Sequence, residues 1–186
     1  MTSPILKCLL AWTVLALPVA ACATDYTVQH PASTLGFSDT FQGQRFDGHF
    51  GQWTTAISYD PSELAHSAFD VTVDLASVKT GDSDRDGALP GPDFFDVAKY
   101  PQAHFVSTGF HEAGGKVIAD GRLTLHGITR PVSLTVEFKP QGRHATLDVG
   151  GTLKRLDFDV GGGQYADTSV IGGDVKIAAH LVLVAR

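Results

Sequence analysis

Residues 69–75 read Phe-Asp-Val-Thr-Val-Asp-Leu, and every second side chain in this run is apolar. A period of two is typical of a β-strand, in which successive side chains point to opposite faces. The alternation places Phe69, Val71 and Val73 on one face and the acidic side chains on the other. We therefore expect a half-buried strand whose apolar face packs on a core and whose acidic face meets water.

The same alternation recurs in further segments that are separated by Gly, Pro and Asp. These segments are residues 53–59, 117–125, 132–138, 147–153 and 175–183. No long segment after Asp25 shows the period of a helix. Many short strands predict an all-β fold, and closing the sheet on itself would remove its edges. We therefore expect an antiparallel β-barrel of about eight strands.

One long polar segment interrupts this pattern. Residues 78–101 are rich in turn residues, and the segment is too long for a simple hairpin loop. Pro92 followed by Asp93 predicts a short helical excursion near residues 92–98.

Composition narrows the classes of function. The 186 residues include 14 Lys and Arg against 20 Asp and Glu, which gives a net charge of −6. These charges are mixed along the chain, so no basic stripe is available to neutralise phosphates. We therefore expect no nucleic-acid partner.

The N-terminal residues differ from the rest of the chain. Lys7 precedes an apolar stretch over residues 8–17, which ends at Pro18 and is followed by small residues. This order predicts a secretory signal peptide over residues 1–23 and a single domain over residues 24–186. We therefore expect a periplasmic protein.

The cleavage site has two interpretations. The triplet Ala21-Cys22-Ala23 fits cleavage before Thr24, whereas residues 19–22 also resemble a lipoprotein box. In the second case Cys22 would be lipidated and would become the first mature residue. Cys8 and Cys22 are the only cysteines, so neither interpretation allows a disulfide inside the mature domain.

Several motifs along the chain resemble the YceI-like family. Residues 80–86, 93–97 and 99–101 (TGDSDRD, DFFDV and KYP) resemble its central motif, and residues 121–132 (GRLTLHGITRPV) resemble its G-x-L-T-[IL]-x-G-[VI]-T-[KR]-P-V hairpin. Arg-Leu-Asp-Phe at 155–158 resembles its late R-x-D-F element. The resemblance spans about residues 26–183. It implies a periplasmic, lipocalin-like barrel that binds polyisoprenoid or other long-chain lipids.

The aromatic residues have two interpretations, and the resemblance favours one of them. Any single one of them is explained by an ordinary filled core. The resemblance implies that these residues together form the wall of a cavity. The cavity would hold a polyisoprenoid, an isoprenoid quinone or a related lipid, and we expect no other cofactor. The apolar lumen residues that we expect to contact the ligand are Phe41, Phe50, Trp53, Ile57, Phe69, Val71, Phe94, Phe105, Leu123, Leu134 and Phe158.

A second hypothesis concerns a protein partner. Residues 161–175, with Gln-Tyr-Ala-Asp at 164–167, resemble family members associated with di-haem b-type cytochromes. The alternative function is therefore a non-catalytic accessory protein of a membrane b-type cytochrome or respiratory complex. Such a protein would act through its surface, and its core would be filled.

Residues 82–87, Asp-Ser-Asp-Arg-Asp-Gly, begin like a calcium-binding loop. Against calcium, Asp93 stands where a bidentate Glu is usual, Pro90 occupies the ninth place, and no flanking helices are expected. The family resemblance instead implies that Arg85, Asp86 and Asp93 lock the loop by pairing with each other and with backbone N–H groups. We expect that structural role.

No motif in the sequence predicts catalysis or metal binding. The eight histidines have no H-x-H or H-E-x-x-H spacing. The sequence also lacks a G-x-S-x-G elbow, a phosphate-binding G-x-x-x-x-G-K-[ST] loop and a G-x-G-x-x-G fingerprint. We therefore expect neither a metal site nor catalytic residues, and a binding protein rather than an enzyme.

Overall fold

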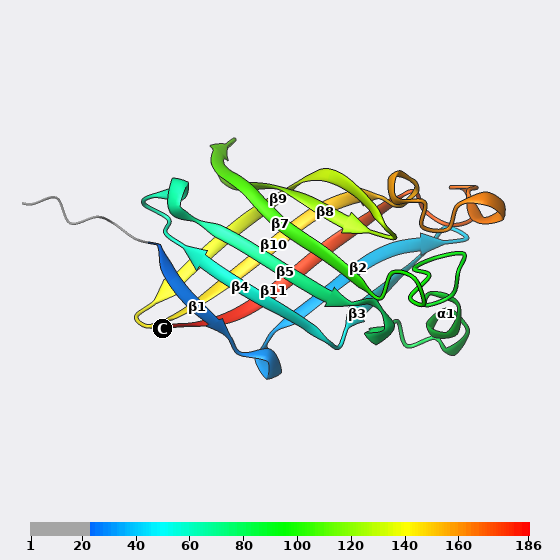
Figure 1. The fold of residues 1–186 in the computed structure, drawn as a ribbon, viewed down its shortest axis with the longest axis horizontal. Helices are drawn as coiled ribbons and strands as arrows, with labels where there is room; N and C mark the ends of the chain where they lie inside the picture. The colour runs from blue at the N-terminus through cyan, green and yellow to red at the C-terminus, as the bar shows by residue number, and fades with distance from the viewer. Residues whose placement is uncertain (1–22) are drawn as a thin grey trace, which may run out of the picture.

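The computed structural model describes residues 23–186, and Figure 1 shows their fold. The strands are β1 (Thr24–Val28), β2 (Thr34–Phe41), β3 (Gln44–Phe50), β4 (Trp53–Tyr59), β5 (Ala68–Asp74), β6 (Val78–Lys79), β7 (Gln102–Ala113), β8 (Lys116–Leu125), β9 (Ile128–Gln141), β10 (His144–Lys154) and β11 (Asp174–Ala185). One short helix, α1 (Ser83–Ala88), and five 3₁₀ helices accompany them in this part of the chain: η1 (His30–Ala32), η2 (Leu64–His66), η3 (Leu75–Ser77), η4 (Arg155–Phe158) and η5 (Gly163–Tyr165). The expected signal peptide covers residues 1–23, and all of it except Ala23 lies outside the described residues. Both cysteines also lie outside them. The division of the chain before Thr24 or Cys22 stays a prediction.

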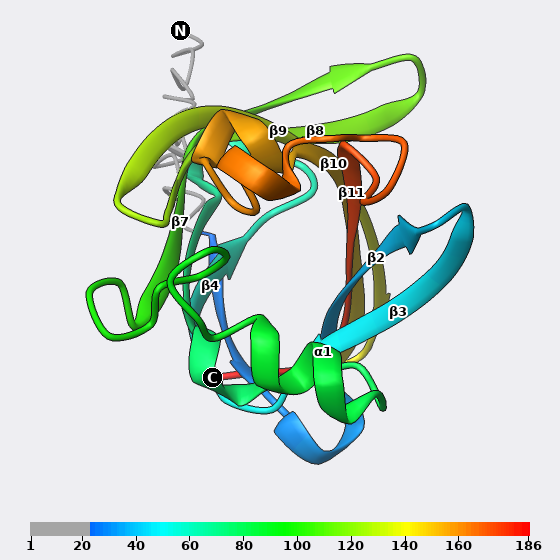
Figure 2. The ribbon, with the colours of Figure 1, turned by 90° about the vertical axis from the view of Figure 1, so that its right-hand side faces the viewer.

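Eight strands close into an antiparallel barrel, which confirms the predicted fold class. Their order is β1, β4, β5, β7, β8, β9, β10 and β11, and β11 pairs back to β1 with Tyr26 opposite Ala185. Figure 2 looks along the barrel from the end that carries α1. No helix in residues 23–186 combines the length and the apolar character needed to cross a bilayer.

The edge of β11 is shared between two strands. Its residues 183–185 pair with β1, whereas its residues 176–180 pair with β2. β2 then continues the sheet through β3 to β6. In Figure 2 the β2–β3 hairpin extends away from the barrel axis at the end near α1.

The predicted strands are present, and alternation overlooked five others. In β7 the register shifts between Ser107 and Gly109, which interrupts the period of two. In β2 the charged Asp39 occupies an inward position between Phe37 and Phe41, so the apolar face does not stand out in the sequence. β1, β3 and the two-residue β6 were also not identified from alternation.

The short helix lies about ten residues before its predicted position. The Asp82 carboxylate caps α1 by accepting a hydrogen bond from the backbone N–H of Arg85 at 2.9 Å. Residues 92–98 form turns instead, and Asp96 has a φ of 45°. The short helix was therefore predicted at the wrong position. The Asp82 cap starts the helix earlier, and the left-handed backbone of Asp96 prevents a continuous helix over residues 92–98.

The face assignment along β5 is correct. Phe69 and Val73 are buried, whereas the Asp70 side chain is 53% exposed and contacts His104 Nε2 at 2.8 Å on the outside of the barrel. The buried apolar side chains of the other barrel strands join the same cluster. The core is thus the inside of the barrel.

Candidate functional site

The barrel encloses an apolar cavity of about 750 Å³. This volume lies within the roughly 300–1,000 Å³ typical of small-molecule sites. Its wall is built from inward side chains of barrel strands, such as Leu147 on β10 and Leu181 on β11, and is extended by β2 and β3. The cavity is therefore the lumen itself and not a groove on the surface.

All of the predicted lumen residues line this one cavity. They come from seven strands, the loop after α1 and η4: Phe41, Phe50, Trp53, Ile57, Phe69, Val71, Phe94, Phe105, Leu123, Leu134 and Phe158. Phe41 differs from the others because it is 42% exposed and lies at the rim. The shared location of these residues is a structural finding, whereas their contact with a ligand stays a prediction.

One end of the lumen is closed by packed aromatic rings. The ring of Tyr59 lies 4.9 Å from that of Phe138 and 6.0 Å from that of Phe110, measured between centroids. Phe138 also meets Tyr26 at 5.7 Å, and Phe110 meets Phe69 at 4.9 Å. Tyr59 is only 2% exposed. We call these five side chains the aromatic floor, and they separate the cavity from solvent at this end.

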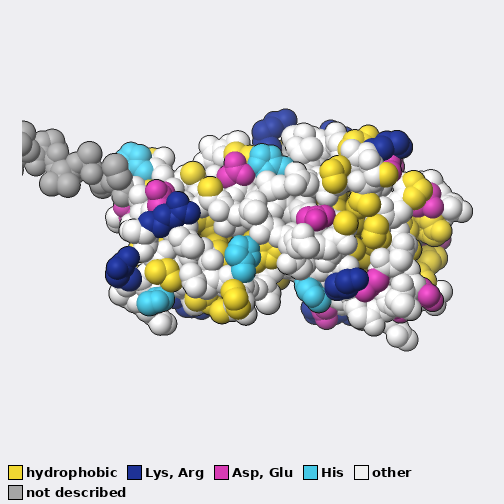
Figure 3. Space-filling model, turned by 60° about the horizontal axis from the view of Figure 1, so that its bottom comes forward, with side chains coloured by type: hydrophobic (Ala, Val, Ile, Leu, Met, Phe, Trp, Pro, Cys, Tyr) yellow, Lys and Arg dark blue, Asp and Glu magenta, His cyan; other side chains and the backbone are white. Residues whose placement is uncertain are grey.

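The other end is framed by two segments, residues 80–101 and 155–173. They meet where the Gly161 N–H donates to the Asp93 carbonyl at 2.9 Å and where the rings of Phe94 and Tyr165 lie 5.1 Å apart. We call this end the mouth. Figure 3 shows apolar side chains gathered at its surface, among acidic and basic ones. Its large exposed apolar side chains are Phe41, Leu156, Tyr165 and Val170.

Arg155 holds the second of these segments in place. Its side chain donates from Nε to the Gly172 carbonyl at 2.8 Å, and from its two terminal nitrogens to the carbonyls of Val160, Gly161, Tyr165 and Ile171. A guanidinium has five N–H donors, so the backbone of this segment uses all of them. Burial lowers the pKa of Arg155 below its usual value, and the Asp39 carboxylate partly opposes that effect.

Asp39 is the one acidic residue on the inner face of β2. It is 8% exposed, and its Oδ1 accepts a hydrogen bond from the backbone N–H of Thr40 at 2.7 Å. Burial raises the pKa of Asp39, and the field of Asp174 adds to this effect, whereas the Thr40 N–H and the Arg155 guanidinium lower it. A Cβ added at Gly172 would overlap this carboxylate. The site therefore accommodates a buried carboxyl group beside a buried guanidinium.

The Asp-rich segment before the mouth is locked differently from what the resemblance implied. Asp86 accepts hydrogen bonds from the backbone N–H and the hydroxyl of Thr80, each at 2.7 Å. Arg85 lies 4.0 Å from Asp82 and stacks at 4.0 Å over the Phe46 ring, so the expected pairing of Arg85 with Asp86 or Asp93 was wrong. The backbone N–H contact of Asp86 is as expected.

The carboxylates of this segment are not arranged as calcium ligands would be. Asp82 caps the helix and Asp86 bonds Thr80, so the two carboxylates are turned to different partners. Within residues 23–186 no three His, Cys, Asp or Glu side chains come together as metal ligands would. His104, His111 and His180 each pair with one aspartate on the outer surface.

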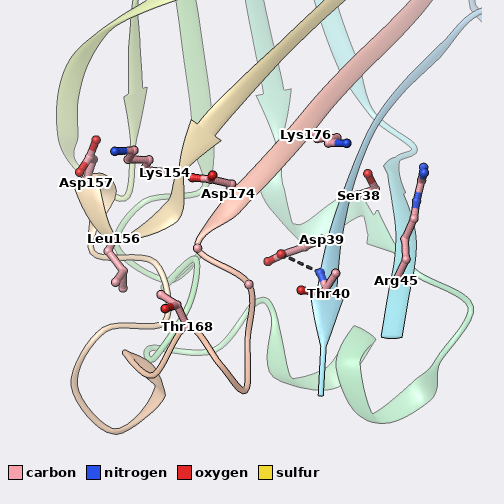
Figure 4. Close-up of a pocket in the computed structure, with 12 residues that line it drawn as sticks. Ser38, Asp39, Thr40, Arg45, Lys154, Leu156, Asp157, Thr168, Asp174 and Lys176 are labelled. Atoms are coloured by element: carbon pink, nitrogen blue, oxygen red, sulfur yellow. Dashed lines mark hydrogen bonds between the residues drawn. The ribbon is translucent and has the colours of Figure 1, made fainter. Parts of the chain in front are cut away.

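A second pocket, of about 620 Å³, lies outside the lumen where β2 and β11 diverge. Figure 4 shows its polar side chains, with Asp39 projecting from β2 into the gap beside the start of β11. Asp39 also lines the apolar cavity, so its carboxyl group separates the two spaces. The three cations of this pocket, Arg45, Lys154 and Lys176, are matched by the three aspartates Asp39, Asp157 and Asp174.

Sequence reasoning missed the two buried charged residues that line the cavity at the mouth, Asp39 and Arg155. Arg155 was recognised only as part of a family motif, and nothing local to it reveals carbonyl partners up to 17 positions away. Asp39 does carry a signal, because a charged residue at an inward position between Phe37 and Phe41 interrupts an otherwise apolar face.

The comparisons with known proteins agree with one another. A family model described as the YceI-like domain matches residues 26–183. A UPF0312 protein of Vibrio parahaemolyticus is 34% identical over 166 residues, which cover 82% of this chain and 88% of the relative. The structure of Burkholderia cenocepacia BcnA has a TM-score of 0.80 at 32% identity, covering 84% of this chain and 99% of that one.

A more distant structure shares the fold alone. It is described as a polyisoprenoid binding domain from Saccharophagus degradans implicated in plant cell wall breakdown. Its TM-score is 0.67 at 20% identity, covering 87% of this chain and 98% of that one. None of these descriptions mentions a cytochrome, so the cytochrome partner stays a prediction.

Proposed function

Because the chain belongs to the YceI-like family, we propose that it binds a long-chain apolar lipid in the barrel lumen and sequesters or transports it. The ligand class is a polyisoprenoid, an isoprenoid quinone or a related lipid. The observation that carries this proposal is the apolar cavity of about 750 Å³, closed at one end by the aromatic floor. The description of the Saccharophagus degradans domain as polyisoprenoid binding supports the same class.

The energetics of burial support a chain-like ligand. Each CH₂ group moved from water into an apolar site contributes about 0.8 kcal/mol. The loss of chain flexibility and of rigid-body motion offsets part of that gain. The deep wall offers apolar contact and few polar partners, so affinity would come from chain length more than from directional bonds.

The proposal includes a place and a manner of action. The leader-like N-terminal residues support export to the periplasm, with cleavage before Thr24 or lipidation at Cys22. There the protein would carry its ligand without catalysis and without a further cofactor. A water-insoluble lipid needs such a carrier to cross an aqueous compartment.

Two measurements test the lumen as the binding site. Mass spectrometry of lipids extracted from the purified protein should find an isoprenoid-type chain. Val71→Trp places a large ring on the cavity wall and should abolish binding of a hydrophobic probe, while the thermal unfolding of ligand-free protein stays near that of the wild type. In a filled core the same change would overpack and destabilise the fold by about 1–3 kcal/mol.

The matched control is Thr72→Trp, which adds the same ring on the outer face of β5. It should leave probe binding unchanged. A strongly destabilised Val71→Trp variant, together with no ligand bound by the wild type, would reject the lumen site and favour the alternative hypothesis of a cytochrome-accessory protein.

A further inference from the structure

The charged side chains of the cavity gather at the mouth. They are Asp39 on β2, Asp82, Asp84 and Arg85 at α1, and Arg155 at the start of η4. The lining from β4, β5 and β7 to β10 is apolar apart from Thr55. A lipid whose chain fills the apolar part therefore leaves its polar end beside these charged groups.

Neither guanidinium at the mouth is free to clamp a phosphate. Arg155 donates all five N–H groups to backbone carbonyls, so a phosphate would have to displace bonds that hold the segment 155–173. Arg85 stacks on Phe46 and lies 4.0 Å from the Asp82 carboxylate, which already offsets its charge. Three carboxylates stand against two guanidinium groups in the lining.

Of the two buried charged residues in the cavity lining, Asp39 is the one that still has capacity for a ligand. The one hydrogen bond to its carboxylate from the described residues is that of the Thr40 N–H to Oδ1. No fully buried polar side-chain atom in this part of the chain lacks a partner, so Oδ2 keeps accessible surface. Asp39 lines both the apolar cavity and the polar pocket, so its side chain borders the space in which the head of a bound lipid would lie.

We propose that Asp39 determines which lipid head the cavity accepts: an uncharged head that carries a hydroxyl donor, and not a phosphorylated one. The hydroxyl would donate to Oδ2, and a hydrogen bond to a charged acceptor in a partly buried site is a strong one. A diphosphate would meet the same carboxylate as a repelling charge, and neither guanidinium of the cavity lining, Arg85 or Arg155, is free to compensate for it. This inference rests on the proposed function, because it assigns the head of the lipid whose chain fills the lumen.

The test compares three probes that share an isoprenoid chain: geranylgeraniol, geranylgeranyl diphosphate and phytane, the hydrocarbon without a head. Competition against a fluorescent hydrophobic probe gives each affinity. The wild type should bind the alcohol about tenfold or more tighter than the diphosphate, which is the scale of one hydrogen bond to a charged group. Asp39→Asn keeps the shape but removes the charge, and should reduce that preference to about threefold or less.

The matched control is Asp70→Asn, which makes the same change on the outer face of β5 and should keep the wild-type preference. Equal or tighter binding of the diphosphate by the wild type would overturn the inference, and this result needs no variant. An unchanged preference in Asp39→Asn would overturn the role of Asp39. Binding of phytane without any discrimination among heads would leave the proposed function standing and reject the inference, whereas failure of all three probes to bind would reject both.

Discussion

At one end of the barrel, Tyr59 is buried among the rings of Phe69, Phe110 and Phe138. At the other end, Asp39 and Arg155 are buried beside the cavity. The floor is built from barrel strands, whereas the mouth depends on two long segments outside the regular sheet. Stability at the floor therefore comes from ring packing, and order at the mouth comes from hydrogen bonds to backbone carbonyls.

The largest expected effect follows from Arg155→Ala. Its removal leaves five carbonyls of the segment 155–173 without their donor, and buried acceptors without partners each cost about 1–3 kcal/mol. Since water can reach some of them, we expect a loss of about 4–5 kcal/mol in the free energy of unfolding, measured with denaturant. Arg143→Ala is the control, because Arg143 makes a single exposed bond to the Ala185 carbonyl. A loss of less than about 1 kcal/mol would show that the mouth does not depend on this residue.

A change in the aromatic floor should lower stability but have little effect on ligand binding. Tyr59→Ala removes a ring that is 2% exposed, and deleting a large buried aromatic costs about 3–4 kcal/mol. Tyr59 does not line the cavity, so the affinity for a hydrophobic probe should change little when it is measured well below the unfolding temperature. Abolished binding in this variant at a temperature where it is fully folded would mean that the two ends are not separable.

The smallest effect is expected at Asp86, in the segment before the mouth. The hydroxyl of Thr80, with its backbone N–H, lowers the pKa of Asp86 below the usual value of 3.8. The folded state therefore favours the carboxylate, and this stabilisation is present above that value and disappears as the pH falls through the lower folded value. Asp86→Ala should lower the melting temperature at pH 7 and narrow its difference from the wild type in acid. Asp84→Ala in the same helix is the control and should not show this pH-dependent loss of melting temperature. Parallel pH profiles of the melting temperature for Asp86→Ala and the wild type would contradict the prediction.

The sequence predicts the two ends unequally well. Alternation in the residues around Phe69 and Ile57 reveals which face of each strand is inward, because strand geometry is local. The family resemblance supplies the rest of the lumen, and every predicted residue lies on the cavity wall. The mouth resists prediction, because the partners of Arg155 are carbonyls whose positions depend on how a distant segment turns back.

Local signals in the sequence can also mislead. Pro92 indicates a helix start, yet Asp82 provides the cap that is used. In β7 a bulge next to Gly109 breaks the alternation that would identify the strand. Asp39 is a more useful signal, because a charged residue on an otherwise apolar strand face predicts a buried charge even where its partners are unknown.

The pairing of β1 with β11 has a consequence for how the chain folds. Arg186 Nε donates to Thr27 Oγ1 at 3.1 Å, which joins residues 159 positions apart, and Tyr26 of the same strand completes the aromatic floor against Phe138. Contacts of such long sequence separation form slowly, because a large loop must close before they contribute any stability. Until β1 pairs with β11, the sheet is open and has two unpaired edges. Unpaired edges of this kind favour aggregation, and the pairing of β11 with β1 removes them.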